Sequence, residues 1–125
     1  MSQPDMVNHP DHYSKFPNGV GLECIEYAQE MSFCQGNAFK YVYRMGNKDD
    51  PNQDSDKAQF YLNSAINHGD FGPISSHLID TISVATPRGF LLWHIANGFL
   101  NNSLALLKYS DEYKDFSRLD ERNDV

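Results

Sequence analysis

The sequence predicts an all-α protein, a small single-domain fold of about four to five helices. Its 125 residues suit one domain, and a content of 40% hydrophobic and 13% aromatic residues can bury a core. Apolar residues recur at helical spacing in several segments, and segments rich in Gly, Pro, Asn and Asp separate them. We expect four regions: an irregular arm over 1–19, a motif-bearing helical region over 20–69, a helical region that packs or oligomerises over 70–109, and a charged tail over 110–125.

Two helices are expected at the start of the helical region. In VGLECIEYAQEM, over 20–31, apolar residues occupy one face and Glu23, Glu26 and Glu30 the other, as in an amphipathic helix. A second helix should run over 33–45 and end at Gly46, because glycine readily adopts the left-handed conformation that closes helices. The arm before them contains Pro10 and Pro17, which limit regular structure.

A third helix should follow the loop NKDDPNQDS, with Asp54 or Ser55 as its N-cap. Its apolar stripe has the spacing i, i+3, i+4, i+7, i+8 of a one-sided helix. The stripe consists of Ala58, Tyr61, Leu62, Ala65 and Ile66. Gly69, Gly72 and Pro73 then predict a break.

The C-terminal half is predicted to hold two further helices. ISSHLIDTISVA, over 74–85, favours helix over strand, although its β-branched residues would tolerate a strand. Thr86 and Pro87 are typical of an N-cap and a first helical residue, and the helix that begins there could reach Tyr109. It is apolar on most sides, but its polar residues His94, Asn97, Asn101 and Asn102 argue against a membrane span. We therefore expect it to be buried or, preferably, to pack against another subunit.

Charge and composition limit the possible partners. A formal net charge of -7 argues against duplex DNA or an anionic membrane as the main partner, because both require broad positive surface. The polar N-terminus does not resemble a signal peptide, and two cysteines without C-x-x-C spacing fit a reducing cytoplasm. A small anionic ligand fits better than a polyanion.

One segment is positively charged, although the chain as a whole is negative. FCQGNAFKYVYRMGNK, over 33–48, contains Lys40, Arg44 and Lys48 and no Asp or Glu. At about 100 degrees per residue, Lys40 and Arg44 share a helix face with Asn37 and Tyr41. Two cations on adjacent turns suit phosphate oxygens, and the alternative is an ordinary solvated helix face.

Other polar clusters allow alternatives. His9, His12 and Tyr13 could stack on and hydrogen-bond a ring, or could form only a local turn. A zinc site made from the histidines with Cys24 and Cys34 matches no metal signature, so no metal site is predicted. Glu23, Glu26 and Glu30 could hold a divalent cation or act as a base, or could be an exposed face.

Four ordered blocks of the sequence resemble the SaV-like family of small phage proteins. These blocks are VNHPDHY at 7–13, LECIEY at 22–27, FCQGNAFKYVYRMGNK at 33–48 and DSDKAQFYL at 54–62. The sequence departs from the family pattern at Ser55, where leucine is usual, and residues 67–125 lie outside the blocks. The positions that match the motifs are His9, His12, Tyr13, Glu23, Glu26, Asn37, Lys40, Tyr41, Arg44, Lys48, Lys57 and Tyr61.

The resemblance implies a nucleotide kinase-like protein acting on nucleoside monophosphates in the host cell cytoplasm. No P-loop motif G-x-x-x-x-G-K-[ST] is present, so side chains and helix ends would hold the phosphates. Lys40, Arg44 and Lys48 would bind phosphate, Asn37 and Tyr41 would orient the nucleotide, and Glu23 or Glu26 would position the acceptor. A nucleoside triphosphate with magnesium would be the donor, and His9, His12 and Tyr13 would close over the base or sugar.

Three alternatives to the kinase stay open. The first is a non-catalytic protein that binds or sequesters a nucleotide in a phage–host conflict. The second is an all-helical nucleotide pyrophosphohydrolase, for which Glu23 and Glu26 supply one carboxylate pair and a second pair is missing. A single-strand nucleic-acid binder is the least favoured, because the cationic stripe is short and its surroundings are acidic.

Overall fold

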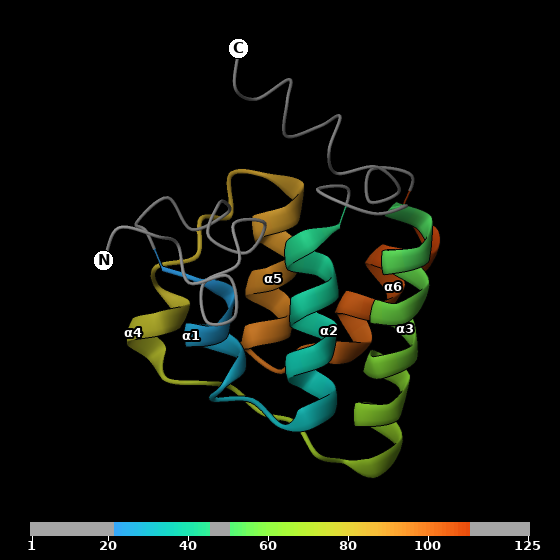
Figure 1. Ribbon diagram of the computed structural model, residues 1–125, viewed down its shortest axis with the longest axis horizontal. Coiled ribbons are helices and arrows are strands. Elements are labelled where there is room, and N and C mark those ends of the chain that lie inside the picture. The colour runs from blue at the N-terminus through green and yellow to red at the C-terminus, as the bar shows by residue number, and fades with distance from the viewer. Residues whose placement is uncertain (1–21, 46–50, 111–125) are drawn as a thin grey trace, which may run out of the picture.

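The computed structural model describes residues 22–45 and 51–110, and these residues form helices without a strand. The described residues contain six helices, which Figure 1 labels. Their bounds are α1 Cys24–Ala28, α2 Phe33–Arg44, α3 Pro51–His68, α4 Ser76–Ile79, α5 Pro87–Ala96 and α6 Leu100–Tyr109. The predicted all-α class is confirmed.

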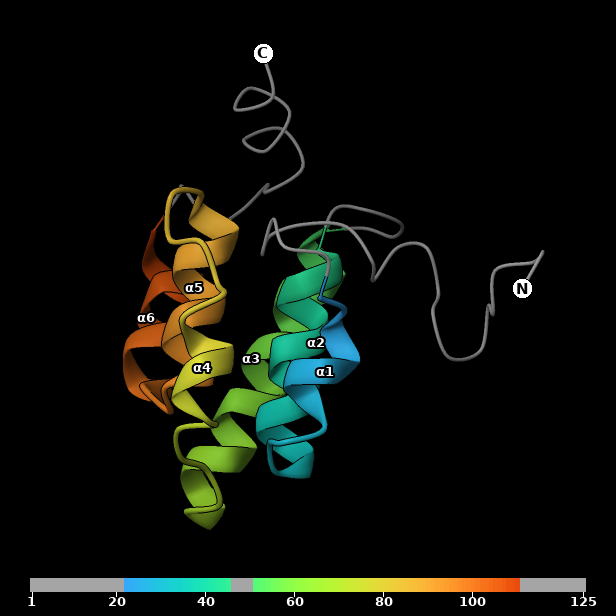
Figure 2. The same cartoon turned by 90° about the vertical axis from the view of Figure 1, so that its left-hand side faces the viewer.

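The helices form two layers. Figure 2 shows α1, α2 and α3 on one side and α4, α5 and α6 on the other. Helix α2 contacts α1 and α3 within its own layer and α5 across the layers, while α3 contacts α6. The motif-bearing helices therefore lie together in one layer, and the C-terminal half covers their inner face.

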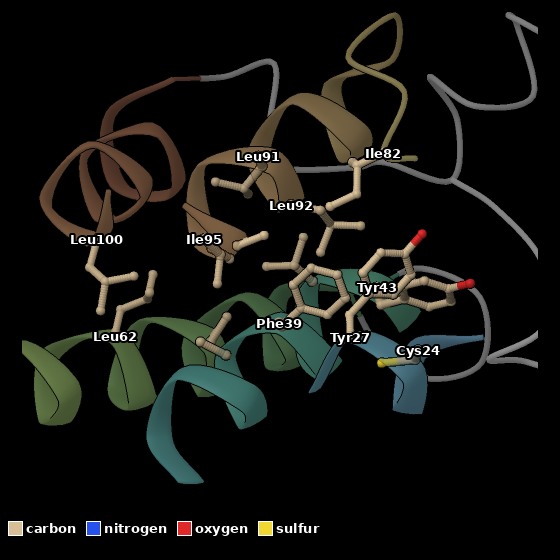
Figure 3. Close-up of a cluster of buried hydrophobic side chains, with 14 of the residues drawn as sticks. Cys24, Tyr27, Phe39, Tyr43, Leu62, Ile82, Leu91, Leu92, Ile95 and Leu100 are labelled. Atoms are coloured by element: carbon tan, nitrogen blue, oxygen red, sulfur yellow. The ribbon is translucent and has the colours of Figure 1, made fainter. Parts of the chain in front are cut away.

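The core fills the space between these layers. Figure 3 shows the rings of Tyr27, Phe39 and Tyr43 facing leucine and isoleucine side chains of the opposite layer. The Tyr27 and Phe39 ring centroids lie 5.3 Å apart, a distance typical of packed aromatic pairs. Residues predicted in the separate regions 20–69 and 70–109 thus contribute to one core.

Helix α1 is shorter than the predicted helix over 20–31. It begins after Glu23 and ends at Ala28, and the chain then turns through Gln29 and Glu30. Helix α2 begins after Ser32, whose Oγ accepts a hydrogen bond from the Gln35 backbone N–H (3.3 Å). Its last residue is Arg44, within one residue of the prediction, while the predicted stop at Gly46 lies outside the described residues.

Helix α3 begins at Pro51, before the predicted start, and the prediction of Asp54 or Ser55 as its N-cap is wrong. Proline is well suited to a first helical turn, because a backbone N–H there would have no partner in the helix and proline lacks one. Asp54 lies inside that first turn and is fully buried, with its carboxylate directed to Arg44. The predicted stripe is confirmed, since Ala58, Leu62 and Ala65 are buried, and the helix ends before Gly69 at a φ of 65°.

The segment 74–85 forms only the four-residue helix α4. Hydroxyl side chains account for its early end, because they offer the backbone alternatives to helical hydrogen bonds. Thr81 Oγ1 donates to the Leu78 carbonyl (2.7 Å), and Ser83 Oγ accepts from the Ala85 N–H (3.2 Å). The predicted longer helix over this segment is therefore wrong.

The single helix predicted over 87–109 is two helices, α5 and α6. Its start is confirmed, because Thr86 Oγ1 accepts from the Gly89 N–H (3.0 Å) and Pro87 is the first residue. The break lies at Gly98, which has a φ of 79°, and a Cβ there would lie 3.0 Å from the Gly72 backbone. Within the described ranges, no helix is long and apolar enough to cross a membrane.

Candidate functional site

Helices α2 and α3 bring three cationic side chains to one aromatic ring. Lys40 Nζ lies 4.6 Å, Arg44 Cζ 5.3 Å and Lys57 Nζ 5.4 Å from the centroid of Tyr41. Tyr61 stacks on the same ring, with centroids 5.9 Å apart and planes 8° from parallel. We call these residues, Lys40, Tyr41, Arg44, Lys57 and Tyr61, the tyrosine–cation cluster.

The cluster concentrates much of the positive charge of the described chain. The cationic residues of the two described ranges are Lys40, Arg44, Lys57, Arg88 and Lys108. Arg88 is buried elsewhere in the fold and Lys108 is exposed on α6, so the other three meet at Tyr41. A ring face attracts cations electrostatically, by about 0.5–1 kcal/mol each at exposed sites.

Arg44 is held by a buried carboxylate. Its Nε lies 3.4 Å from Asp54 Oδ1, and the two side chains are 16% and 0% exposed. Such a pair fixes the direction of the guanidinium, because moving either partner would leave a charge buried without its counter-charge. The negative charge of Asp54 also balances part of the positive charge of the cluster.

The aromatic contacts continue from the cluster towards the start of α2. The Phe33 ring meets Tyr61 edge-on at a centroid distance of 6.1 Å. Phe33, Tyr61 and Tyr41 therefore form an aromatic row that alternates between α2 and α3, with the cations at the Tyr41 end.

The acidic residues in and beside α1 make structural hydrogen bonds. Glu26 Oε2 accepts a hydrogen bond from the Glu23 N–H (2.7 Å), a bond that closes the first turn of α1. Glu30 Oε1 accepts from Ser75 Oγ (2.9 Å) and from the Ser75 N–H (3.3 Å), which ties α1 to the start of α4. In the part of the chain that the structure describes, no three His, Cys, Asp or Glu residues are grouped to hold a metal ion.

Of the other predicted site residues on the matched motifs, Asn37 makes a local hydrogen bond. Asn37 Nδ2 donates back to the Phe33 carbonyl (2.8 Å), so its amide is engaged within α2. His9, His12, Tyr13 and Lys48 lie outside the described residues. Their predicted roles stay predictions.

Two buried polar side chains that the sequence analysis missed hold α2 in place. Gln35 Nε2 donates to the carbonyls of Gly72 and Ile95 (both 2.8 Å), and its Oε1 accepts from the Gly72 N–H (3.1 Å). Arg88 Nη1 donates to the carbonyls of Val42 and Tyr43 (both 2.9 Å).

The two missed residues differ in how well sequence could reveal them. The signal for Gln35 was available, because helical periodicity places it about 160 degrees from Asn37, on the packing side of α2. Arg88 had no local signal, since its partners lie 45 and 46 residues away.

Burial raises the pKa of two core side chains, Cys24 and Tyr43. Desolvation raises the pKa of the Cys24 thiol to about 12, against a smaller opposing effect of the Lys40 charge. Burial also raises the pKa of the Tyr43 hydroxyl well above its usual range. Both groups are neutral near pH 7, so neither cancels the positive charge of the cluster.

A shallow apolar groove of about 440 Å³ lies between α5 and α6, in the other layer. None of its lining residues in the described part of the chain is Lys, Arg, Asp or Glu. Its lining consists of Phe90, His94, Asn102, Ala105, Leu106, Tyr109 and Ser110. This α5–α6 groove contains none of the predicted site residues.

Comparison with curated proteins and with solved structures finds no match. A protein-family model does match residues 7–63, which include α1, α2 and most of α3. The whole tyrosine–cation cluster falls within the matched residues, whereas Arg88 and the α5–α6 groove do not. Over residues 7–63 the chain is thus similar to a family described as a protein of unknown function, DUF3310.

Proposed function

We propose that the tyrosine–cation cluster binds the phosphate groups of a nucleotide. The observation that carries this proposal is the convergence of Lys40, Arg44 and Lys57 on one ring, from two helices, in a chain of net charge -7. Three cations repel one another, and among the described residues Asp54 supplies one balancing negative charge. A bound phosphate would relieve the rest, through a forked guanidinium contact and two ammonium contacts.

An ordinary solvated surface explains this geometry less well. Long cationic side chains on such a surface gain little from fixed positions and usually spread into water. Here the Arg44 side chain is only 16% exposed and is fixed by Asp54, while both lysines lie near the Tyr41 ring. Sites that are fixed before the ligand arrives bind it at a lower entropic cost.

Phosphoryl transfer is the enzymatic form of the proposal and follows from the SaV-like resemblance. Lys40 and Arg44, with Lys48, would hold the transferred phosphoryl group of a nucleoside monophosphate kinase without a P-loop. Glu23 or Glu26 would position the acceptor, and magnesium would arrive with the triphosphate, because the described residues offer no grouped metal ligands.

Non-catalytic binding or sequestration is the second candidate. It is favoured by the position of Glu26, whose carboxylate accepts the Glu23 N–H and so contributes to the start of α1. The same bond and the lack of grouped carboxylates in the described residues weigh against a pyrophosphohydrolase.

Calorimetry tests the binding proposal. Inorganic pyrophosphate and deoxynucleoside monophosphates are titrated into the full-length protein and into the variants Lys40→Ala and Lys57→Ala. Each substitution should weaken binding roughly tenfold, as expected for loss of a charge-assisted contact. Lys108→Ala removes an equivalent charge from α6 and should bind as the unmodified protein does. Equal affinities in all four proteins would overturn the proposal.

A product assay then separates the two candidates. Chromatography of each deoxynucleoside monophosphate incubated with several triphosphates and magnesium detects any diphosphate formed. Product that disappears in Lys40→Ala would support the kinase. Binding without product would support the sequestering protein.

We also propose that the chain forms a homo-oligomer through the α5–α6 groove. Two copies of so acidic a chain repel one another, and a face whose described lining residues include no Lys, Arg, Asp or Glu is where they could approach at least cost. Tyr109 in this lining is 81% exposed, which also fits an apolar contact. Light scattering after gel filtration measures the state, and a monomer at all concentrations would refute this assignment.

A further inference from the structure

We infer that the exposed end of the aromatic row, Phe33 together with Phe60, binds the base of the same nucleotide. This inference rests on the proposed function and adds to it the position of the base. Phe33 is 74% and Phe60 63% exposed, although both are large apolar side chains. Their rings meet Tyr61 edge-on, at centroid distances of 6.1 and 5.2 Å.

Helical periodicity connects Phe33 to the cations. Taking Asn37 as zero, Phe33 lies at about 320 degrees on α2, between Lys40 at about 300 and Arg44 at about 340 degrees. The first and last turns of α2 thus present one face, with a ring at one end and cations at the other. A single exposed phenylalanine needs no explanation, but two that flank one tyrosine beside a cation cluster indicate a surface for a flat ligand.

The order of rings and charges indicates which nucleic-acid species fits. Within the described ranges, the cation–ring contacts of the row are all at Tyr41, and none is with the ring of Phe33. A single-stranded nucleic acid has a phosphate between successive bases and would need cations along the whole row. A mononucleotide has its base at one end and its phosphates at the other, which matches the observed separation.

The decisive experiment uses the double variant Phe33→Ala/Phe60→Ala in the full-length protein. Calorimetry measures its affinity for deoxynucleoside monophosphates, for inorganic pyrophosphate and for a short oligodeoxythymidylate. Loss of base stacking should weaken mononucleotide binding about tenfold or more and leave pyrophosphate binding unchanged. Phe99→Ala, which removes an exposed phenylalanine next to α6 in the opposite layer and outside the groove lining, is the matched control and should change neither affinity.

The outcomes separate this inference from the proposed function. Unchanged mononucleotide affinity in the double variant, with weakened binding in Lys40→Ala, would overturn the base site and keep the phosphate site. No binding of any nucleotide by the unmodified protein would overturn both. Tighter binding of the oligonucleotide than of mononucleotides would refute the assignment to a single nucleotide. Phe33→Leu, which keeps apolar bulk without an aromatic face, should also lose affinity and thereby excludes unfolding as the cause.

Discussion

The face formed by α2 and α3 and the α5–α6 groove both carry aromatic side chains, but only the first places cations against them. Tyr41 has three cations within 5.4 Å of its centroid, whereas no Lys, Arg, Asp or Glu is among the described residues that line the groove. Both faces could bury apolar surface. Under the proposed function, the charges beside the first surface would give it a preference for nucleotides, and the second surface would suit contact with protein.

Removing Arg88 tests the connection between these two regions, and we expect it to have the largest effect. Arg88→Met deletes the buried donor to the carbonyls of Val42 and Tyr43, so the protein should lose about 2–4 kcal/mol of stability. Urea unfolding measures the loss. Lys108→Met, an exposed change on α6, should leave the midpoint unchanged, and equal midpoints for both variants would show that Arg88 does not join the layers.

Asp54→Asn increases the difference in charge between the tyrosine–cation cluster and the groove. It removes the negative charge beside Arg44 with little change in shape, so stability should fall by about 1–3 kcal/mol. Pyrophosphate should bind roughly threefold or more tightly, because the cluster becomes more positive. Asp56→Asn, an exposed change on the same helix, is the control for calorimetry. Weaker pyrophosphate binding in Asp54→Asn would mean that Asp54 matters for the position of Arg44 more than for its charge.

Ala105→Lys adds a charge to the uncharged groove. Two copies that meet through this face would place the new lysines near each other, so the oligomer should dissociate while nucleotide affinity stays the same. Gel filtration with light scattering measures the change. Asn101→Lys adds the same charge to an exposed position of α6 outside the groove lining and should leave the oligomer intact. If both variants dissociate, the groove is not the contact.

The smallest expected effect is the pH dependence due to Cys24. Burial raises its folded pKa from 9.0 to about 12, so above about pH 9 only the unfolded chain releases this proton. Stability should therefore be complete below pH 9 and fall as the pH rises towards 12. Urea unfolding between about pH 8 and 9.5, below the range where tyrosines titrate, isolates the thiol. Cys24→Ala should flatten the slope and Cys34→Ala should not.

Local signals predicted the ends of several helices. The pair Thr86 and Pro87 and the break after His68 lie where the sequence placed them, because caps and glycine turns act within a few residues. The break at Gly98 had a local signal too, but the apolar run on both sides of it favoured a continuous helix. Asp54 resembled an N-cap, and its actual role in pairing with Arg44 depends on how α3 packs against α2.

The candidate site was predictable in part for the same reason. Periodicity alone placed Lys40, Tyr41 and Arg44 on one face of α2. Lys57 and Tyr61 entered only through the family resemblance, because no spacing rule relates residues on two helices. The exposure of Phe33 and the burial of Arg88 depend on tertiary packing, which the sequence does not reveal residue by residue.

Hydrogen bonds with α5 hold both ends of α2 in place. Gln35 in its first turn donates to Ile95 near the end of α5, and the carbonyls of Val42 and Tyr43 accept from Arg88 near the start of α5. The family match ends at residue 63, so Ile95 and Arg88, the partners in these bonds, lie outside the segment that carries the motifs. For protein engineering this sets a clear limit: a minimal nucleotide binder cut after residue 63 would need new partners for both ends of α2. Any chain that joins these motifs to a different second half must supply its own acceptor for Gln35 and its own donor in place of Arg88.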